Sequence, residues 1–191
     1  METLETNAAE YEAGVSRIVA QAVLDAGCLL EGEFIFASGI RAKYRLDMER
    51  LLNNPGKLAI VRTCLVNHPA LAPADVLLAV PEGAQKLFGN FLSKALQIPL
   101  ARLERPPLAR SRYEFRFVSG EDAMLARQAD HPRIVEDVVT TLGSVAGVVN
   151  LLDPDQQNIE AVIVWRRGEV NSAYSNGFRQ HYLVEQHIPL Y

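Results

Sequence analysis

The chain has 191 residues, of which 49% are hydrophobic and 22% charged, and its net charge at pH 7 is −4. This length is sufficient for the core of one ordinary domain, and the composition is that of a globular protein. The acidic balance argues against nucleic-acid binding through bulk positive charge, and no apolar run reaches the ~18 residues that a membrane-spanning helix needs. The acidic N-terminal stretch METLETNAAEYEAG does not have the pattern of a signal peptide. We therefore expect a cytoplasmic protein that has neither nucleic acid nor membrane as a partner.

The first fifty residues are expected to form a helix and a hairpin-like element. Apolar residues recur at helical spacing over residues 8–27, and Gly27 supplies the helix stop. Residues 32–47, GEFIFASGIRAKYRLD, then alternate apolar and polar side chains in two short pieces joined at Ser38-Gly39. We expect residues 1–50 to pack as a small hood over a core formed by residues 51–191, within a single domain.

The remaining chain alternates strand-like and helix-like segments. The expected helices cover residues 57–66, 85–96 and 143–151, and the expected strands cover residues 75–80 and 98–103, a segment beginning at 132–135, and residues 159–165. The run DVLLAV at 75–80 is fully apolar, as buried parallel strands tend to be, and PEGA breaks it. Strands that alternate with helices of about ten to fifteen residues predict an α/β fold with a mainly parallel, doubly wound sheet flanked by helices.

Residues 104–116, ERPPLARSRYEFR, interrupt this alternation and are here called the arginine loop. The segment holds two prolines and four arginines and has little apolar periodicity. This composition predicts either a mobile basic loop or a β-ribbon. Its positive charge must meet either solvent or an anion.

The stretch IVEDVVTTLGS, residues 134–144, places two adjacent carboxylates, Glu136 and Asp137, at the end of an apolar run. Ligands of open α/β sheets bind beyond the carboxyl ends of the strands. The turn TTLGS offers hydroxyls and backbone N–H groups at a helix start, a combination that holds a phosphate monoester. The acids would repel that phosphate unless they face ribose hydroxyls or a Mg²⁺ ion shared with the ligand. The stretch thus predicts a site for a phosphorylated sugar; the alternative is an ordinary strand, turn and helix with solvated acids.

The full arrangement of apolar run, acid pair, two valines, two threonines, glycine and serine resembles the phosphoribosyl-pyrophosphate (PRPP) motif of the type I phosphoribosyltransferases. Leu142 occupies a position that is usually small or glycine in that motif. The resemblance implies a pentosyltransferase that moves a 5-phosphoribosyl group from PRPP to a nucleobase, with Mg²⁺ as cofactor. It assigns catalytic roles to Glu136 and Asp137, and it makes Asp137 the metal ligand. The PRPP-binding residues that it implies are Pro81, Glu82 and Gly83, in a stretch similar to the family's pyrophosphate loop, and Thr140, Thr141, Leu142, Gly143 and Ser144.

Other stretches are similar to orotate phosphoribosyltransferases in particular. Residues 32–47 resemble the N-terminal element of that family, and EAVIVWRRG falls where the family ends a strand with an arginine that meets the carboxylate of the base. The base-binding residues that this implies are Arg41, Lys43, Tyr44 and Arg167. The resemblance also implies orotate as the base, a role in pyrimidine biosynthesis, and a homodimer whose subunits complete each other's active sites.

The arginine loop departs from the family pattern. Glu104 and Arg105 replace an Arg-Lys pair, Leu108 replaces a further lysine, and no lysine follows Lys94. Arg105, Arg110 and Arg112 remain as candidates for binding the leaving pyrophosphate, because guanidinium binds phosphate bidentately. Two functions therefore stay open: a phosphoribosyltransferase, and a non-catalytic PRPP or nucleotide sensor that regulates a partner.

Overall fold

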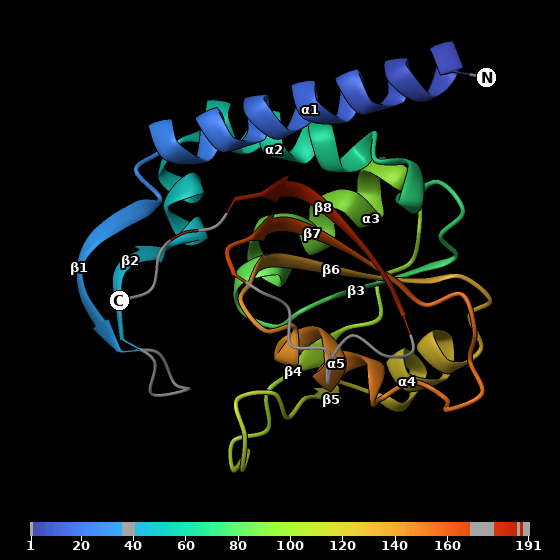
Figure 1. Ribbon diagram of the computed structural model, residues 1–191. Helices are drawn as coiled ribbons and strands as arrows, with labels where there is room; N and C mark the ends of the chain where they lie inside the picture. The colour runs from blue at the N-terminus through green and yellow to red at the C-terminus, as the bar shows by residue number, and fades with distance from the viewer. Residues whose placement is uncertain (1, 36–40, 169–177, 187, 189–191) are drawn as a thin grey trace.

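The computed structural model describes residues 2–35, 41–168, 178–186 and 188, with side chains described from residue 10 onward. Its centre is a four-stranded parallel sheet in the order β3-β6-β7-β8 (Figure 1). The strands are β3 (Val76–Ala79), β6 (Pro132–Val139), β7 (Glu160–Arg166) and β8 (Arg179–Glu185). All of β3 and most of β6 and β7 are buried, as expected for a parallel sheet covered on both faces. The predicted α/β fold is confirmed.

Helices cover both faces of this sheet. The helices α1 (Glu2–Asp25), α2 (Pro55–Val66) and α3 (Asn90–Leu96) lie on one face, and α4 (Gly120–Arg127) and α5 (Gly143–Val149) lie on the other (Figure 1). The start of α2 is fixed locally, because Pro55 occupies its first turn and the Asn54 side chain accepts a hydrogen bond from the Lys57 amide. Three short helical pieces, η1 (Met48–Asn53), η2 (Pro69–Leu71) and the π-helical η3 (Gln85–Gly89), connect the layers.

The antiparallel pair β1 (Leu29–Ile35) and β2 (Arg41–Leu46), the strand part of the predicted hood, stands at the carboxyl edge of the sheet (Figure 1). Its expected joint at Ser38-Gly39 lies outside the described residues. The buried Arg167, which follows β7, donates a hydrogen bond from Nη2 to the Tyr44 carbonyl oxygen at 3.0 Å. This contact ties β2 to the end of the central sheet, so the hood has a defined position over that edge.

Several elements differ from the expectation. Helix α1 begins earlier than residue 8, and both α4 and β8 were not foreseen. The expected strand at 98–103 is reduced to a single parallel bridge between Leu77 and Leu100, next to Pro99, which has no N–H for the ladder. The arginine loop is a ribbon only at its base, where the two-residue strands β4 (Leu103–Glu104) and β5 (Arg116–Phe117) pair.

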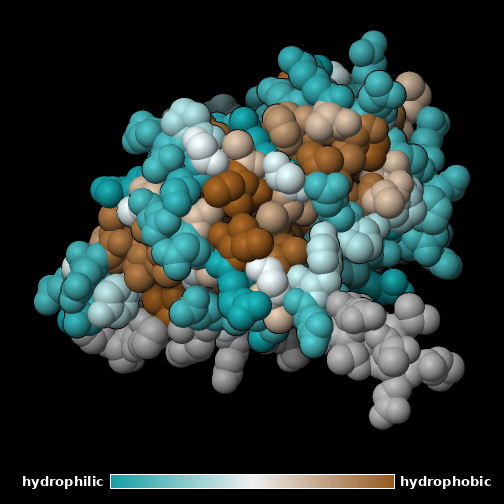
Figure 2. Space-filling model, turned by 90° about the horizontal axis from the view of Figure 1, so that it is seen from above, coloured by the Kyte–Doolittle hydropathy of each residue, from teal (hydrophilic) through white to brown (hydrophobic). Residues whose placement is uncertain are grey.

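Apolar side chains remain on the outer face formed by α1 and its neighbours. Figure 2 shows this face, with hydrophobic side chains gathered among polar ones. Large apolar residues that stay exposed on α1 and α2 are Tyr11, Ile18, Leu24 and Ile60. Among the described helices, none combines the length and apolar character needed to cross a bilayer.

Candidate active site

A cavity of about 500 Å³ opens at the carboxyl ends of β3 and β6, between the hood and the arginine loop. The chain leaves β3 towards Leu100 on one side, whereas β6 lies on the other side of β3. Such a switch in strand order leaves a crevice between the two outgoing loops, and ligands bind there in open α/β sheets. The lining residues are 45–49, 80–83 and 136–144, together with Arg105, Arg112, Tyr113 and Phe115.

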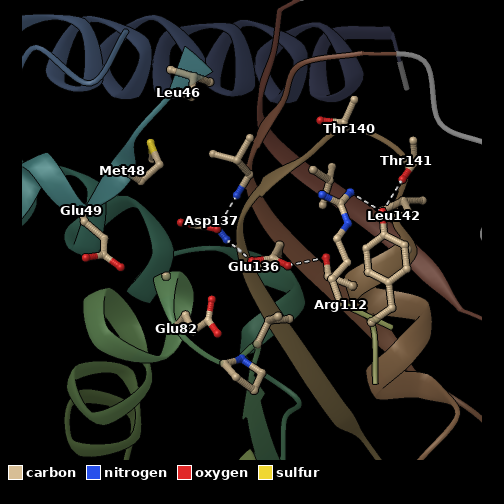
Figure 3. Close-up of a pocket in the computed structure, with 18 of the residues that line it drawn as sticks. Leu46, Met48, Glu49, Glu82, Arg112, Glu136, Asp137, Thr140, Thr141 and Leu142 are labelled. Atoms are coloured by element: carbon tan, nitrogen blue, oxygen red, sulfur yellow. Dashed lines mark hydrogen bonds between the residues drawn. The ribbon is translucent and has the colours of Figure 1, made fainter. Parts of the chain in front are cut away.

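The predicted acid pair lies in this cavity, held by hydrogen bonds (Figure 3). Glu136, which is 4% exposed, accepts hydrogen bonds from the Ser144 hydroxyl at 2.6 Å and from the Asp137 amide at 3.0 Å. Burial, and then the charge of Asp137, raise the pKa of Glu136 well above its usual range, and burial also raises the pKa of Asp137. The pair therefore has a strong tendency to acquire a proton, a cation or hydrogen-bond donors from a ligand.

Gly83 allows Asp137 to lie directly against the loop that follows β3. A β-carbon at Gly83 would collide with the carboxylate of Asp137. Only glycine therefore permits this close approach of the two loops. The predicted pyrophosphate loop and the predicted ribose acids are thus in contact, although 54 positions of chain separate Gly83 from Asp137.

Each of the two predicted phosphate loops also contains a non-glycine residue with a left-handed backbone. Glu82 has φ +76° and Leu142 has φ +65°. For ordinary L-residues this conformation costs about 1–2 kcal/mol, and such costs concentrate at ligand sites. Leu142 is also 1% exposed, so its side chain contributes to the core beneath the turn. This accounts for a leucine at the position where the PRPP motif usually has a small residue.

The turn at residues 140–144, here called the threonine turn, lines the cavity, but its polar groups have different partners. Thr140 and Thr141 are half-buried at the cavity wall, whereas the Ser144 hydroxyl is donated to Glu136. Helix α5 has only seven residues, so the hydroxyls and the backbone amides of the turn provide more for an anion than the helix dipole does. The prediction of a phosphate site at this turn is geometrically consistent and remains a prediction.

The arginine loop spans the cavity through a continuous series of contacts. Arg105 Nε donates to Glu82 Oε1 at 3.0 Å, and its Nη1 donates to the carbonyl oxygen of Arg112. Arg112 Nη2 in turn donates to the Tyr113 hydroxyl, which lies 3.4 Å from Thr141 Oγ1. Figure 3 shows Arg112 extending towards Thr141. The series links the loop after β3 to the threonine turn.

Two of the loop residues at this site, Tyr113 and Phe115, were not assigned from the sequence, and one assigned residue, Arg110, lies elsewhere. Arg112 and Tyr113 line the cavity, but Arg110 does not; its backbone N–H donates to Glu114 Oε2 at 2.6 Å. Local sequence contains one indication of the Tyr113 contact. Gly143 and Gly147 lie four residues apart on one helix face, which is typical of a close neighbour.

The predicted base-binding residues do not line this cavity. Lys43 pairs with Glu31 at 3.0 Å on the surface of the hood, Arg41 is exposed, and Arg167 is 2% exposed beneath Tyr44. Arg45, from the same strand as Arg41 and Lys43, does line the cavity. Their role in base recognition stays a prediction.

The charges around the cavity fit a cation as well as an anion. Five acidic residues line it, Asp47, Glu49, Glu82, Glu136 and Asp137, against three arginines, Arg45, Arg105 and Arg112. Within the described part of the chain, no group of three or more His, Cys, Asp or Glu side chains could hold a metal by itself. One or two carboxylates plus ligand phosphates are, however, the usual ligands of Mg²⁺.

No family model matches the chain, but individual proteins do. Orotate phosphoribosyltransferase of Methanocaldococcus jannaschii is 29% identical over 140 residues, which cover 73% of this chain and 75% of that protein. The protein of the same name from Pyrococcus furiosus is 27% identical over 180 residues, covering 86% and 90%. The crystal structure of orotate phosphoribosyltransferase from Aeropyrum pernix superposes with a TM-score of 0.69 at 21% identity, covering 87% of this chain and 93% of that one. APRTase from Giardia lamblia, complexed with 9-deazaadenine, gives 0.62 at 17% identity, covering 86% and 98%.

Proposed function

We propose that this chain, which belongs to the type I phosphoribosyltransferase family, transfers the 5-phosphoribosyl group of PRPP to orotate and releases pyrophosphate. One observation carries the proposal: the acid pair Glu136-Asp137, the threonine turn and the Gly83 loop line a single cavity. These three groups suit the ribose hydroxyls, the 5-phosphate and the pyrophosphate of one ligand. Sequence relatives named orotate phosphoribosyltransferase support orotate as the base and pyrimidine biosynthesis as the role.

Positioning and charge stabilisation account for most of the proposed catalysis. As the bond from ribose C1 to pyrophosphate breaks and the bond to the base nitrogen forms, positive charge develops on the ribose and negative charge on pyrophosphate. Glu136 and Asp137 accept hydrogen bonds from the ribose hydroxyls and stabilise the positive charge. Thr140 and Thr141 hold the 5-phosphate through their hydroxyls, and Arg105 faces the leaving pyrophosphate.

Mg²⁺ fits this site as the cofactor. The excess of carboxylates over arginines around an intended polyanion leaves a place for a divalent cation, and the half-buried Asp137 is its best protein ligand. When bound, the ion supplies charge neutralisation for the pyrophosphate oxygens.

A PRPP or nucleotide sensor is the second candidate function. It is favoured by the Arg105–Glu82 ion pair, because in this pair the arginine nearest the pyrophosphate loop is already neutralised by a carboxylate of the same chain. The absence of any lysine after Lys94 favours it as well. In this alternative the cavity binds the ligand without transferring its phosphoribosyl group.

Two measurements separate the candidates. Calorimetry with PRPP and Mg²⁺ tests ligand binding, and a pyrophosphate-release assay with orotate and a panel of other bases tests transfer. Release that depends on orotate supports the transferase. Tight PRPP binding without release for any base would replace the transferase with the sensor, and no PRPP binding would contradict both.

The assembly and the base pocket belong to the same proposal. We expect a cytoplasmic homodimer, and Arg41, Lys43, Tyr44 and Arg167 as the residues that recognise the base. The family resemblance supports these assignments. The hood lies beside the cavity, a position compatible with a base bound at the hood end of the cavity (Figure 1).

A further inference from the structure

The second limb of the arginine loop is set into a groove on α5. The Tyr113 ring packs against Gly143 so closely that a β-carbon there would lie 2.5 Å from two ring carbons. A β-carbon at Gly147, one turn further along, would collide with the Tyr113 carbonyl oxygen. Phe115, two residues on, is 5% exposed. This limb is therefore fixed to the element that follows the threonine turn of the same chain.

The first limb of the loop is fixed on the opposite side of the cavity. Arg105 pairs with Glu82, and β4 pairs with β5 at the base of the loop. Because both limbs are held, the loop residues that line the cavity have defined positions around it. These residues are Arg105, at the pyrophosphate loop, and Arg112 with Tyr113, at the threonine turn.

Arg112 is held where an anion on the threonine turn would lie. Its guanidinium stacks on the Tyr113 ring, with 4.5 Å between Cζ and the ring centroid, and its Nη2 donates to the Tyr113 hydroxyl. The Tyr113 hydroxyl is the group next to Thr141 Oγ1. The side chain of Arg112 is exposed at the mouth of the cavity, so it can take an incoming anion without being drawn out of a core. Guanidinium binds phosphate bidentately and strongly.

We propose that Arg112, positioned by Tyr113, binds the 5-phosphate of the ligand. This inference rests on the proposed function for the identity of the ligand, a ribose 5-phosphate ester. The two loop arginines that line the cavity then bind different groups: Arg105 binds pyrophosphate, and Arg112 binds the ribose 5-phosphate. Tyr113 is a positioning residue, because it touches Arg112 and Thr141 and fixes the loop in the groove of α5.

The test compares two probes on five proteins. Calorimetry measures the affinities of ribose 5-phosphate and of pyrophosphate for the intact wild-type chain and for Arg112→Gln, Arg112→Lys, Tyr113→Phe and Arg17→Gln. Arg17→Gln is the charge-matched control, because Arg17 is exposed on α1 and is not part of the cavity lining. Arg112 is exposed too, so its replacement leaves the core intact.

We expect Arg112→Gln to weaken ribose 5-phosphate binding about 10- to 100-fold, as for the loss of charge-assisted hydrogen bonds, with pyrophosphate binding changed less than threefold. Arg112→Lys should recover part of the loss. Tyr113→Phe keeps the ring and removes the hydroxyl, so it should weaken only ribose 5-phosphate, by about two- to tenfold. The control should match the wild type for both probes.

Three outcomes would overturn the inference. They are unchanged ribose 5-phosphate affinity in Arg112→Gln, an equal loss for both probes, and a wild-type chain that binds pyrophosphate but not ribose 5-phosphate. A chain that shows the expected Arg112 dependence but releases no pyrophosphate from PRPP with orotate contradicts the proposed function alone.

Discussion

Thr141 brings one hydroxyl to the cavity, where it lies next to the phenol of Tyr113. Replacing it with valine keeps the branched shape and removes the hydroxyl. We expect Thr141→Val to weaken PRPP binding by about 1–3 kcal/mol, because a hydrogen bond to a charged phosphate is lost. Calorimetry on a correctly folded variant measures the change, and an unaltered affinity would contradict a phosphate site at this turn.

Glu82 combines a left-handed backbone with a negative charge in the loop proposed for pyrophosphate. Glu82→Gln removes the charge and frees Arg105, so pyrophosphate affinity should rise about three- to tenfold. Glu82→Gly should raise the affinity similarly and also stabilise the fold by about 1 kcal/mol, since glycine adopts positive φ without strain.

Calorimetry and thermal unfolding distinguish the two Glu82 variants. Only the glycine variant should unfold at a higher temperature than the wild type. An unchanged pyrophosphate affinity in both variants would show that the carboxylate does not oppose the ligand.

His68 links the stability of the fold to pH. Burial, and then the neighbouring His181, lower the pKa of His68 to about 4, while Glu160 opposes the shift. Between pH 4 and the ordinary histidine value near 6.5 the unfolded chain binds more protons, so the free energy of unfolding should fall as pH decreases through this window. Partial exposure limits the loss to about 1–3 kcal/mol.

Denaturant unfolding at pH 7, 5.5 and 4.5 measures this dependence. His68→Asn is the matched control, because an asparagine oxygen can replace Nδ1 as the acceptor for the Ala70 amide. The asparagine variant should lose less stability towards acid than the wild type. Parallel pH profiles would rule out His68 as the cause.

The arginine loop is the element on which catalysis is expected to depend. Arg105 faces the pyrophosphate loop, and the charge on pyrophosphate grows as it leaves. Arg105→Gln should therefore lower turnover by at least about tenfold while PRPP affinity falls less, since the interaction is stronger in the transition state. Steady-state kinetics and calorimetry on the same variant measure both. A larger effect on PRPP affinity than on turnover would contradict a role in the departure of pyrophosphate.

The sequence predicted the elements whose patterns are local and strong. The buried strand at β3, the breaker PEGA and the acid pair of β6 all lie where apolar runs and turn residues placed them. Helix α4 was missed although the sequence contains its N-cap residue, Ser119. The Ser119 hydroxyl accepts a hydrogen bond from the Asp122 amide at 3.1 Å. Strand β8 was missed because its first four residues are half-buried or exposed and carry polar side chains.

The contacts of the arginine loop could not be read in the same way. The contact of Tyr113 with Gly143 and the pair Arg105–Glu82 join segments that are distant in the sequence, and no periodicity encodes such distances. Two-residue strands such as β4 and β5 are also too short to produce a pattern. Residue types in the loop indicated anion binding, but only the packing separates Arg112 from Arg110.

At the scale of the whole molecule, one cluster of buried side chains is continuous from Val19 of α1 through the sheet to Ile188. The hood contributes to it through Leu46 and Met48. A shared core of this kind favours the prediction that residues 1–191 form a single domain, because separate domains would each bury their own core.

The predicted homodimer is a property of the whole molecule as well. Sedimentation at micromolar concentration should give twice the mass of the chain, and the interface should bury more than ~1,000 Å². The apolar side chains on α1 and α2 are one surface that such an interface could cover (Figure 2). A monomer under these conditions would contradict the prediction.

The packing of α1 against β8 has a consequence for how the protein is made. Strand β8 is at the edge of the sheet, and α1 lies along it, although almost the whole chain separates the two in sequence (Figure 1). On the ribosome α1 emerges before its partner strand has been translated, so its apolar face stays exposed to water or bound to a chaperone until β8 follows. Folding of the intact sheet is therefore expected only after β8 has left the ribosome, and a stalled nascent chain that lacks β8 should remain sensitive to protease.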